Sequence, residues 1–115
     1  MLSGCSAKMS IDDVFGTYIA SYPFGTETLT FNHDMTFVQH VQITGDPKAE
    51  NMKGTWSFDS NTSYVELHDY LQAADGFGKL RPDWRKVSAM AYEPVERQFF
   101  KIIINSGAEY PYMKQ

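Results

Sequence analysis

The sequence predicts an all-β domain built as an antiparallel up-and-down barrel of about eight short strands. Eight Phe, seven Tyr and two Trp supply the large core side chains, and such rings favour strands over helices. Apolar and polar residues alternate with a period of two between short turn sequences. A glycine followed two residues later by a ring occurs at Gly16 and Tyr18 and again at Gly54 and Trp56. A β-sandwich produces the same alternation and is the alternative.

The length and charge of the chain limit its organisation and its partners. At 115 residues it is expected to form one domain, with residues 1–9 as a tether and residues 10–115 as the barrel. The formal net charge is −4 and no basic stripe is visible, which argues against a nucleic-acid partner.

The first predicted elements are a helical turn, a strand and a hairpin. Ser10 supplies an N-cap hydroxyl for a helical turn over residues 10–14. A strand is predicted over residues 15–22, because proline and glycine follow it. Clean alternation predicts paired strands over residues 26–32 and 36–44, joined by a turn rich in Asn and Asp.

The second half of the chain alternates less regularly. Glu93 and Pro94 are expected to form a turn, and a run that is apolar on both faces, including Phe99 and Phe100, predicts a central strand. Residues 69–84 lose the alternation and are expected to form a long loop with a turn of helix at 70–74. Strands are predicted over residues 52–59, 63–68, 85–92, 97–105 and 108–113.

The start of the chain carries the motif Leu2, Ser3, Gly4, Cys5. It resembles the lipobox of bacterial lipoproteins, in which a signal peptidase cuts before the cysteine and the cysteine then carries diacylglycerol. The basic and apolar segments of a signal peptide would lie upstream of Met1. The resemblance implies lipidation of Cys5 and a place at the periplasmic or extracellular face of the bacterial cell envelope. A chance tetrapeptide in a cytoplasmic protein is the alternative.

A membrane-spanning helix is not predicted. No stretch approaches the ~20 apolar residues that a span needs, so any attachment to the membrane is expected through the N-terminal lipid alone.

The N-terminal part of the domain resembles lipocalin-like barrels. In that family a helical turn leads into a first strand with a glycine followed by a ring that closes the barrel floor, as Gly16 and Tyr18 do here. This chain has Tyr18 where the family usually has Trp, and its Trp56 comes in the later unit. The resemblance implies an architecture and brings no ligand with it.

The candidate binding residues combine rings with charged groups, a composition that is usual for contact surfaces. An alternative is a solvated loop pinned to the barrel by its own rings. Trp56 is expected in the core or at the barrel floor, with ligand stacking as a second interpretation. The candidates are Tyr70, Phe77, Arg81, Trp84, Arg85 and Trp56.

No catalytic or metal-binding pattern is found. His33, His40 and His68 lie in separate predicted elements without the spacing of metal ligands. The chain has no Gly-x-Ser-x-Gly elbow, and Cys5 lies in the tether. We therefore expect neither an enzyme nor a bound cofactor or metal.

The expected function is non-covalent binding of a small apolar or amphipathic ligand inside a lipid-anchored barrel. An eight-stranded barrel has room for its own side chains or for one small ligand. Phe31 and Trp56 would fill the interior, whereas Ala20 and Ala91 would leave space. The alternative is an interaction or inhibitor module that contacts another envelope protein through residues 69–86.

Overall fold

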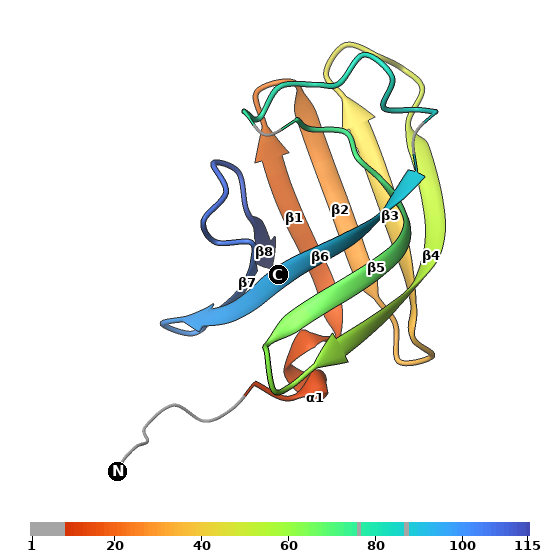
Figure 1. The fold of residues 1–115 in the computed structure, drawn as a ribbon. Coiled ribbons are helices and arrows are strands. Elements are labelled where there is room, and N and C mark those ends of the chain that lie inside the picture. The colour runs from red at the N-terminus through yellow and green to blue at the C-terminus, as the bar shows by residue number, and fades with distance from the viewer. Residues whose placement is uncertain (1–8, 76, 87) are drawn as a thin grey trace.

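The computed structural model describes residues 9–75, 77–86 and 88–115. These residues form a closed barrel of eight antiparallel strands that neighbour one another in sequence order (Figure 1). The all-β barrel prediction is thereby confirmed, and the sandwich is excluded. The elements are α1 (Ile11–Val14), β1 (Gly16–Tyr22), β2 (Gly25–Phe31), β3 (Thr36–Ile43), β4 (Glu50–Asp59), β5 (Tyr64–Leu71), β6 (Ser88–Gln98), β7 (Lys101–Ile104) and β8 (Tyr112–Lys114).

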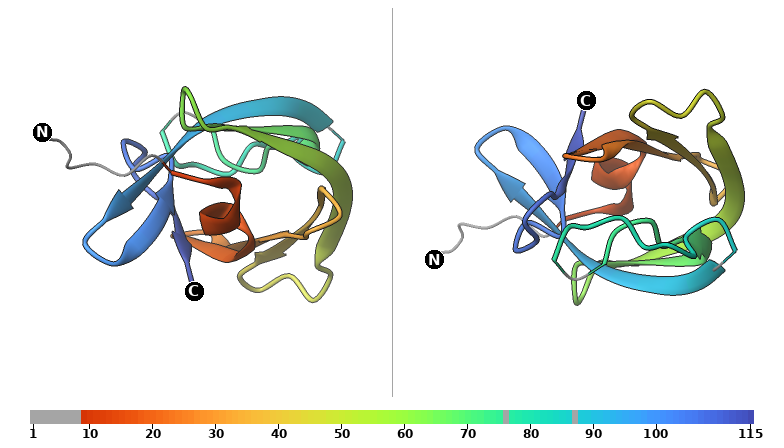
Figure 2. Two further views of the ribbon diagram at one scale, coloured as in Figure 1. Left: turned by 90° about the horizontal axis from the view of Figure 1, so that it is seen from below. Right: turned by 90° about the horizontal axis from the view of Figure 1, so that it is seen from above.

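The short helix α1 lies across one end of the barrel, inside the ring of strands when seen from below (Figure 2). The backbone N–H of Ser10 donates to the Asp13 carboxylate at 2.9 Å, which caps the first turn. The carbonyl of the fully buried Val14 accepts a hydrogen bond of 2.8 Å from the Tyr18 hydroxyl. Tyr18 therefore joins the first strand to the helix at the barrel floor.

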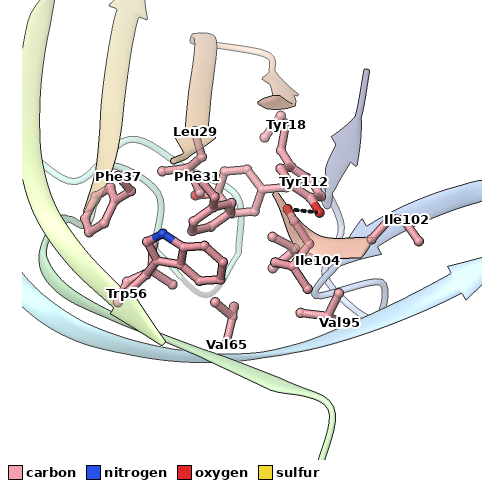
Figure 3. Close-up of a cluster of buried hydrophobic side chains, with 13 residues drawn as sticks. Tyr18, Leu29, Phe31, Phe37, Trp56, Val65, Val95, Ile102, Ile104 and Tyr112 are labelled. Atoms are coloured by element: carbon pink, nitrogen blue, oxygen red, sulfur yellow. Dashed lines mark hydrogen bonds between the residues drawn. The ribbon is translucent and has the colours of Figure 1, made fainter. Parts of the chain in front are cut away.

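Rings fill the interior next to α1. Phe31 lies between Trp56 and Phe37, with ring centroids 4.9 Å and 6.4 Å away (Figure 3). The indole of Trp56 is 2% exposed, and its Nε1 donates to the Asn32 carbonyl at 3.2 Å. Val65 of β5 packs against the same cluster from the opposite wall. Protein atoms thus occupy this half of the barrel.

The hairpin of β2 and β3 follows the predicted alternation. Phe31 pairs with Phe37 next to the turn, and the Asp34 carboxylate accepts a hydrogen bond of 3.0 Å from the Thr36 N–H. The same inward phase contains two polar residues, Glu27 and Gln39, and both are fully or almost fully buried. These two side chains are the first indication that the other half of the interior is not purely apolar.

Gly54 makes room for a ring on the neighbouring strand. It lies opposite Phe37 in the ladder of β3 and β4, while Trp56 follows it on the same face. A Cβ at Gly54 would lie 2.0 Å from the carbonyl oxygen of His68 and 2.5 Å from the Phe37 ring. The prediction that Gly54 and Trp56 share a face is confirmed. The ring that requires a glycine at position 54 is that of Phe37, on the adjacent strand β3.

β5 continues further than the alternation indicated. Its register with β6 shifts between Leu67 and Tyr70, and Asp69 adopts a φ of 66°. This bulge leaves His68 and Asp69 both exposed and adds one residue to β5, so that Tyr70 rather than Asp69 lies opposite Ala89 of β6 and the period of two is shifted. The helical turn predicted at 70–74 is therefore wrong, because the strand runs to Leu71.

The turn predicted at Glu93 and Pro94 is also wrong, because β6 runs through both residues. Pro94 pairs with Tyr64 of β5, and from Val95 onward β6 pairs with β7. The Pro94 carbonyl accepts a hydrogen bond of 2.8 Å from the Asn105 N–H. Proline is tolerated here because the strand changes partner at this point and its missing N–H costs little.

The central strand predicted over residues 97–105 is divided by a tight turn. β6 ends at Gln98 and β7 begins at Lys101, so Phe99 and Phe100 form the turn between them. Their side chains are 95% and 101% exposed, and Phe99 adopts a φ of 57°, a region in which glycine is usual. The prediction failed because apolar residues at a turn have the same pattern as those of a buried strand.

We expect Gly54→Ala to lower the free energy of unfolding by about 2 kcal/mol or more, because its Cβ would overlap backbone and ring atoms. Urea denaturation measures this change. Gly107→Ala is the control, since a Cβ at Gly107 meets no heavy atom within 4 Å. Equal stabilities of the two variants would contradict the close approach at Gly54.

Candidate binding site

Some neighbouring strands of the barrel pair over only a few residues. β7 pairs with β6 only from Val95 to Gln98, and β8 pairs with β1 only at Tyr18 and Ile19. Within the described residues, no strand joins the preceding part of β6 to the last residues of β1. The connection between β7 and β8 loops out beside this seam (Figure 1). It is not the strand predicted over 108–113, because β8 is only Tyr112–Lys114.

A cavity of about 590 Å³ opens at the seam, and we call it the seam pocket. Its walls come from the ends of β1 and β5, from β6, from the loop after β5 and from the connection between β7 and β8. Four of its lining residues are tyrosines, which present both aromatic faces and hydroxyl groups. These are Tyr22, Tyr70, Tyr110 and Tyr112.

A buried polar network lies behind the pocket wall. The Gln39 side-chain amide donates to the Glu27 carboxylate at 2.8 Å and to the Leu71 carbonyl at 2.7 Å. The Leu71 N–H donates back to the Gln39 side-chain oxygen at 2.7 Å. Every polar atom of Gln39 therefore has a partner, which is what a buried amide requires.

Two tyrosines connect this network to the pocket. The Tyr112 hydroxyl donates to the Glu27 carboxylate at 2.5 Å, and it is also hydrogen-bonded to the Tyr70 hydroxyl. Because a phenol has one proton, Tyr70 must donate to Tyr112 when Tyr112 donates to Glu27. The Tyr22 hydroxyl lies 3.4 Å from the other Glu27 oxygen. Glu27 thus orients three of the rings that line the pocket.

Burial raises the pKa of Glu27 to about 7, because the carboxylate has lost its water. Hydrogen bonds from Tyr112 and Gln39 oppose this rise by stabilising the ionised form. Burial also raises the pKa of Tyr70 and of Tyr112 well above the ordinary phenol value, and the nearby Glu27 charge adds to the effect. Both hydroxyls therefore keep their protons at neutral pH.

The lining of the pocket is acidic. It includes Asp75, Glu93 and Glu109, and none of the described residues that line it is Lys, Arg or His. Glu93 is on the inward phase of β6 and is only partly exposed. Its carboxylate forms no hydrogen bond or ion pair within the part of the chain that the structure describes. Burial raises the pKa of Glu93.

The predicted site residues do not come together at one place. Tyr70 lines the seam pocket, whereas Trp56 lies in the apolar half of the barrel. Phe77, in the loop after β5, is 81% exposed. The Arg81 guanidinium pairs with the Asp83 carboxylate at 3.3 Å.

Trp84 and Arg85 lie at a different part of the loop. Trp84 is 4% exposed and packs with Val41, and the Arg85 guanidinium lies 4.6 Å from the centre of its ring. Arg85 also pairs with Asp46 at 2.9 Å and with Glu50 at 3.0 Å. These two residues hold the loop after β5 against the loop before β4.

Cys5, the predicted lipidation site, lies outside the described residues. Among the described residues, no group of three or more His, Asp or Glu side chains is placed to hold a metal ion. Nor do those residues include a helix that is both long and apolar enough to cross a membrane.

The polar residues in and behind the pocket wall escaped the sequence-based prediction, although their phase was visible. Glu27 shares the inward phase of Leu29, and Gln39 that of Val41. Glu93 lies in phase with Ala91 before it and Val95 after it. A polar residue in phase with core residues is the feature that would have identified this half of the interior.

Comparison with known proteins assigns no family to the chain. It matches no model of a protein family, no curated protein and no solved structure. A function for the seam pocket therefore has to follow from the pocket's own residues.

We expect Glu27→Gln to change the pH dependence of stability. The folded carboxyl has a pKa of about 7 against 4.5 as the ordinary value, so its protonated form favours the folded state. That contribution is complete below pH 4.5 and is lost as the pH rises to about 7, by about 3 kcal/mol in all.

Urea denaturation of both proteins across this range tests the expectation. The free energy of unfolding of Glu27→Gln, relative to the wild type, should rise from acid to neutral pH. Glu93, whose pKa is also raised, is present in both proteins and cancels in the comparison. A difference that stays constant with pH would contradict a buried, titrating Glu27.

Proposed function

We propose that this chain is a lipid-anchored envelope protein that binds a small amphipathic molecule in the seam pocket. The observation that carries the proposal is the pocket itself, whose volume of about 590 Å³ lies within the range of small-molecule sites. Its tyrosines offer apolar faces next to polar groups that the Glu27 network holds in place. Such preorganisation favours reversible binding, because little order is lost when a ligand enters.

The position of the pocket modifies the expected mechanism. Phe31, Phe37 and Trp56 occupy the interior near α1, so a ligand would not lie along the whole barrel axis. It would enter from the side, between β6 and the connection that follows β7. A ligand with an apolar part and a polar part suits this lining.

Two features support a membrane-facing end near α1. The first described residue, Met9, is only four residues after Cys5 in the sequence, and α1 begins two residues later. A lipid on Cys5 would therefore hold this end of the barrel near the membrane. The exposed Phe99 and Phe100 lie at the tip of the β6–β7 hairpin, and Arg97 of this hairpin pairs with Asp13 of α1 at 2.9 Å. Two exposed rings beside a lipid anchor are suited to insertion at a bilayer interface.

Binding in the pocket is tested with Nile red, a neutral apolar dye. Its emission should rise and shift to the blue when it binds the wild type, and Ala108→Phe should weaken binding by about tenfold or more by filling the pocket. Thr62→Phe places the same ring on an exposed turn and should bind like the wild type. No dye binding by the wild type, or equal binding by all three proteins, would contradict the proposal.

The orientation at the membrane is tested with the lipidated protein in vesicles that contain brominated phospholipids. Fluorescence from Phe100→Trp, corrected for the two native tryptophans, should be quenched by about twofold or more. Phe77→Trp is the control, because its loop lies at the end of the barrel away from α1 (Figure 1). Equal quenching of both variants, or no loss of lipid labelling in Cys5→Ser, would overturn the membrane arrangement.

A further inference from the structure

The charge distribution of the seam pocket is one-sided. Its lining has three acidic residues and, in the part of the chain that the structure describes, no basic one, and the buried Glu27 lies behind the tyrosine wall. Of the three, Asp75 has other partners: its carboxylate accepts hydrogen bonds from the N–H groups of Phe77 at 2.8 Å and Lys79 at 3.0 Å. Glu109 is exposed to solvent. Glu93 is the acid whose position in the pocket needs an explanation.

Glu93 points inward from β6 and is partly removed from water. It lines the seam pocket together with Tyr22 and Tyr70. A carboxylate that is desolvated and has no ion-pair or hydrogen-bond partner destabilises the fold. Within the described residues Glu93 has neither, so a positively charged group that enters the pocket would supply the partner that the protein itself does not.

The tyrosines add a second feature that favours a cation. Their ring faces carry partial negative charge and attract ammonium groups. The proton of Tyr112 is donated to Glu27, and that of Tyr70 is donated to Tyr112. The oxygen of Tyr70 therefore has acceptor capacity left but no free proton, which matches a ligand that donates hydrogen bonds.

We infer that the seam pocket selects small organic cations, in which an ammonium group is attached to an apolar ring or chain. The ammonium group pairs with Glu93, and the apolar part packs against the rings of Tyr22 and Tyr110, whose centroids lie 5.7 Å apart. This inference rests on the proposed function, since it names the class of ligand for the same pocket.

Three compounds with the same phenyl group and similar chain length separate charge from shape. They are 2-phenylethylammonium, 2-phenylethanol and 3-phenylpropanoate, and isothermal titration near pH 8 measures their dissociation constants. We expect the ammonium to bind about tenfold more tightly than the alcohol, and the carboxylate to bind more weakly than either. Ala108→Phe should weaken the binding of all three.

Glu93→Gln tests the proposed ion pair. It keeps the shape of the side chain and should weaken binding of the ammonium by about tenfold while it leaves the alcohol within about twofold. Glu96→Gln is the matched control on the same strand, because Glu96 is exposed on the outer face of β6. It should change neither affinity.

The outcomes distinguish the proposed function, ligand binding in the seam pocket, from the inference that the ligand is a cation. If the alcohol or the carboxylate binds as tightly as the ammonium and Ala108→Phe abolishes binding, the pocket is a ligand site and the cation inference is overturned. The same conclusion follows if Nile red binds but the ammonium does not. If the wild type does not bind Nile red, the proposed function itself fails.

Discussion

The buried carboxylate of Glu27 ties together strands that lie far apart in the chain. It accepts hydrogen bonds from Gln39 of β3 and from Tyr112 of β8, which is 85 residues away in the sequence. Gln39 in turn holds the backbone of Leu71 at the end of β5. One acidic side chain and the amide bonded to it thus link β2, β3, β5 and β8. Three of the four tyrosines that line the seam pocket are oriented by it, so the binding site depends on this interaction.

The two halves of the interior are stabilised by different forces. Near α1, Phe31, Phe37 and Trp56 fill the space, and the removal of apolar surface from water drives their packing. Further along, Ala20 lies opposite Glu27 in the ladder of β1 and β2. The polar half is held by hydrogen bonds that are directional. Directional hydrogen bonds hold the side chains that line the pocket in defined orientations, whereas the packing of the aromatic half stabilises the fold.

The sequence predicted most of the strands but only part of the site. The alternation of apolar and polar residues located the strands that have one buried and one exposed face, such as the hairpin strands in which Phe31 pairs with Phe37. It failed at the bulge near Asp69, where an extra residue resets the phase, and at Pro94, where the strand changes partner. It also placed Phe99 in a buried strand, because hydrophobicity alone does not show that a residue is at a turn. Tyr70 was predicted as a site residue, but its partners were not.

The sequence by itself determined the all-β class, the approximate number of strands and the inward face of most of them, because these depend on local patterns of period two. It also contained the phase that buries Glu27. Only the tertiary structure decided that Tyr112 of the last strand reaches this carboxylate and that Glu93 lies in the pocket without a partner within the described residues. Those facts depend on contacts between residues far apart in the chain, which follow from closure of the barrel rather than from any local pattern.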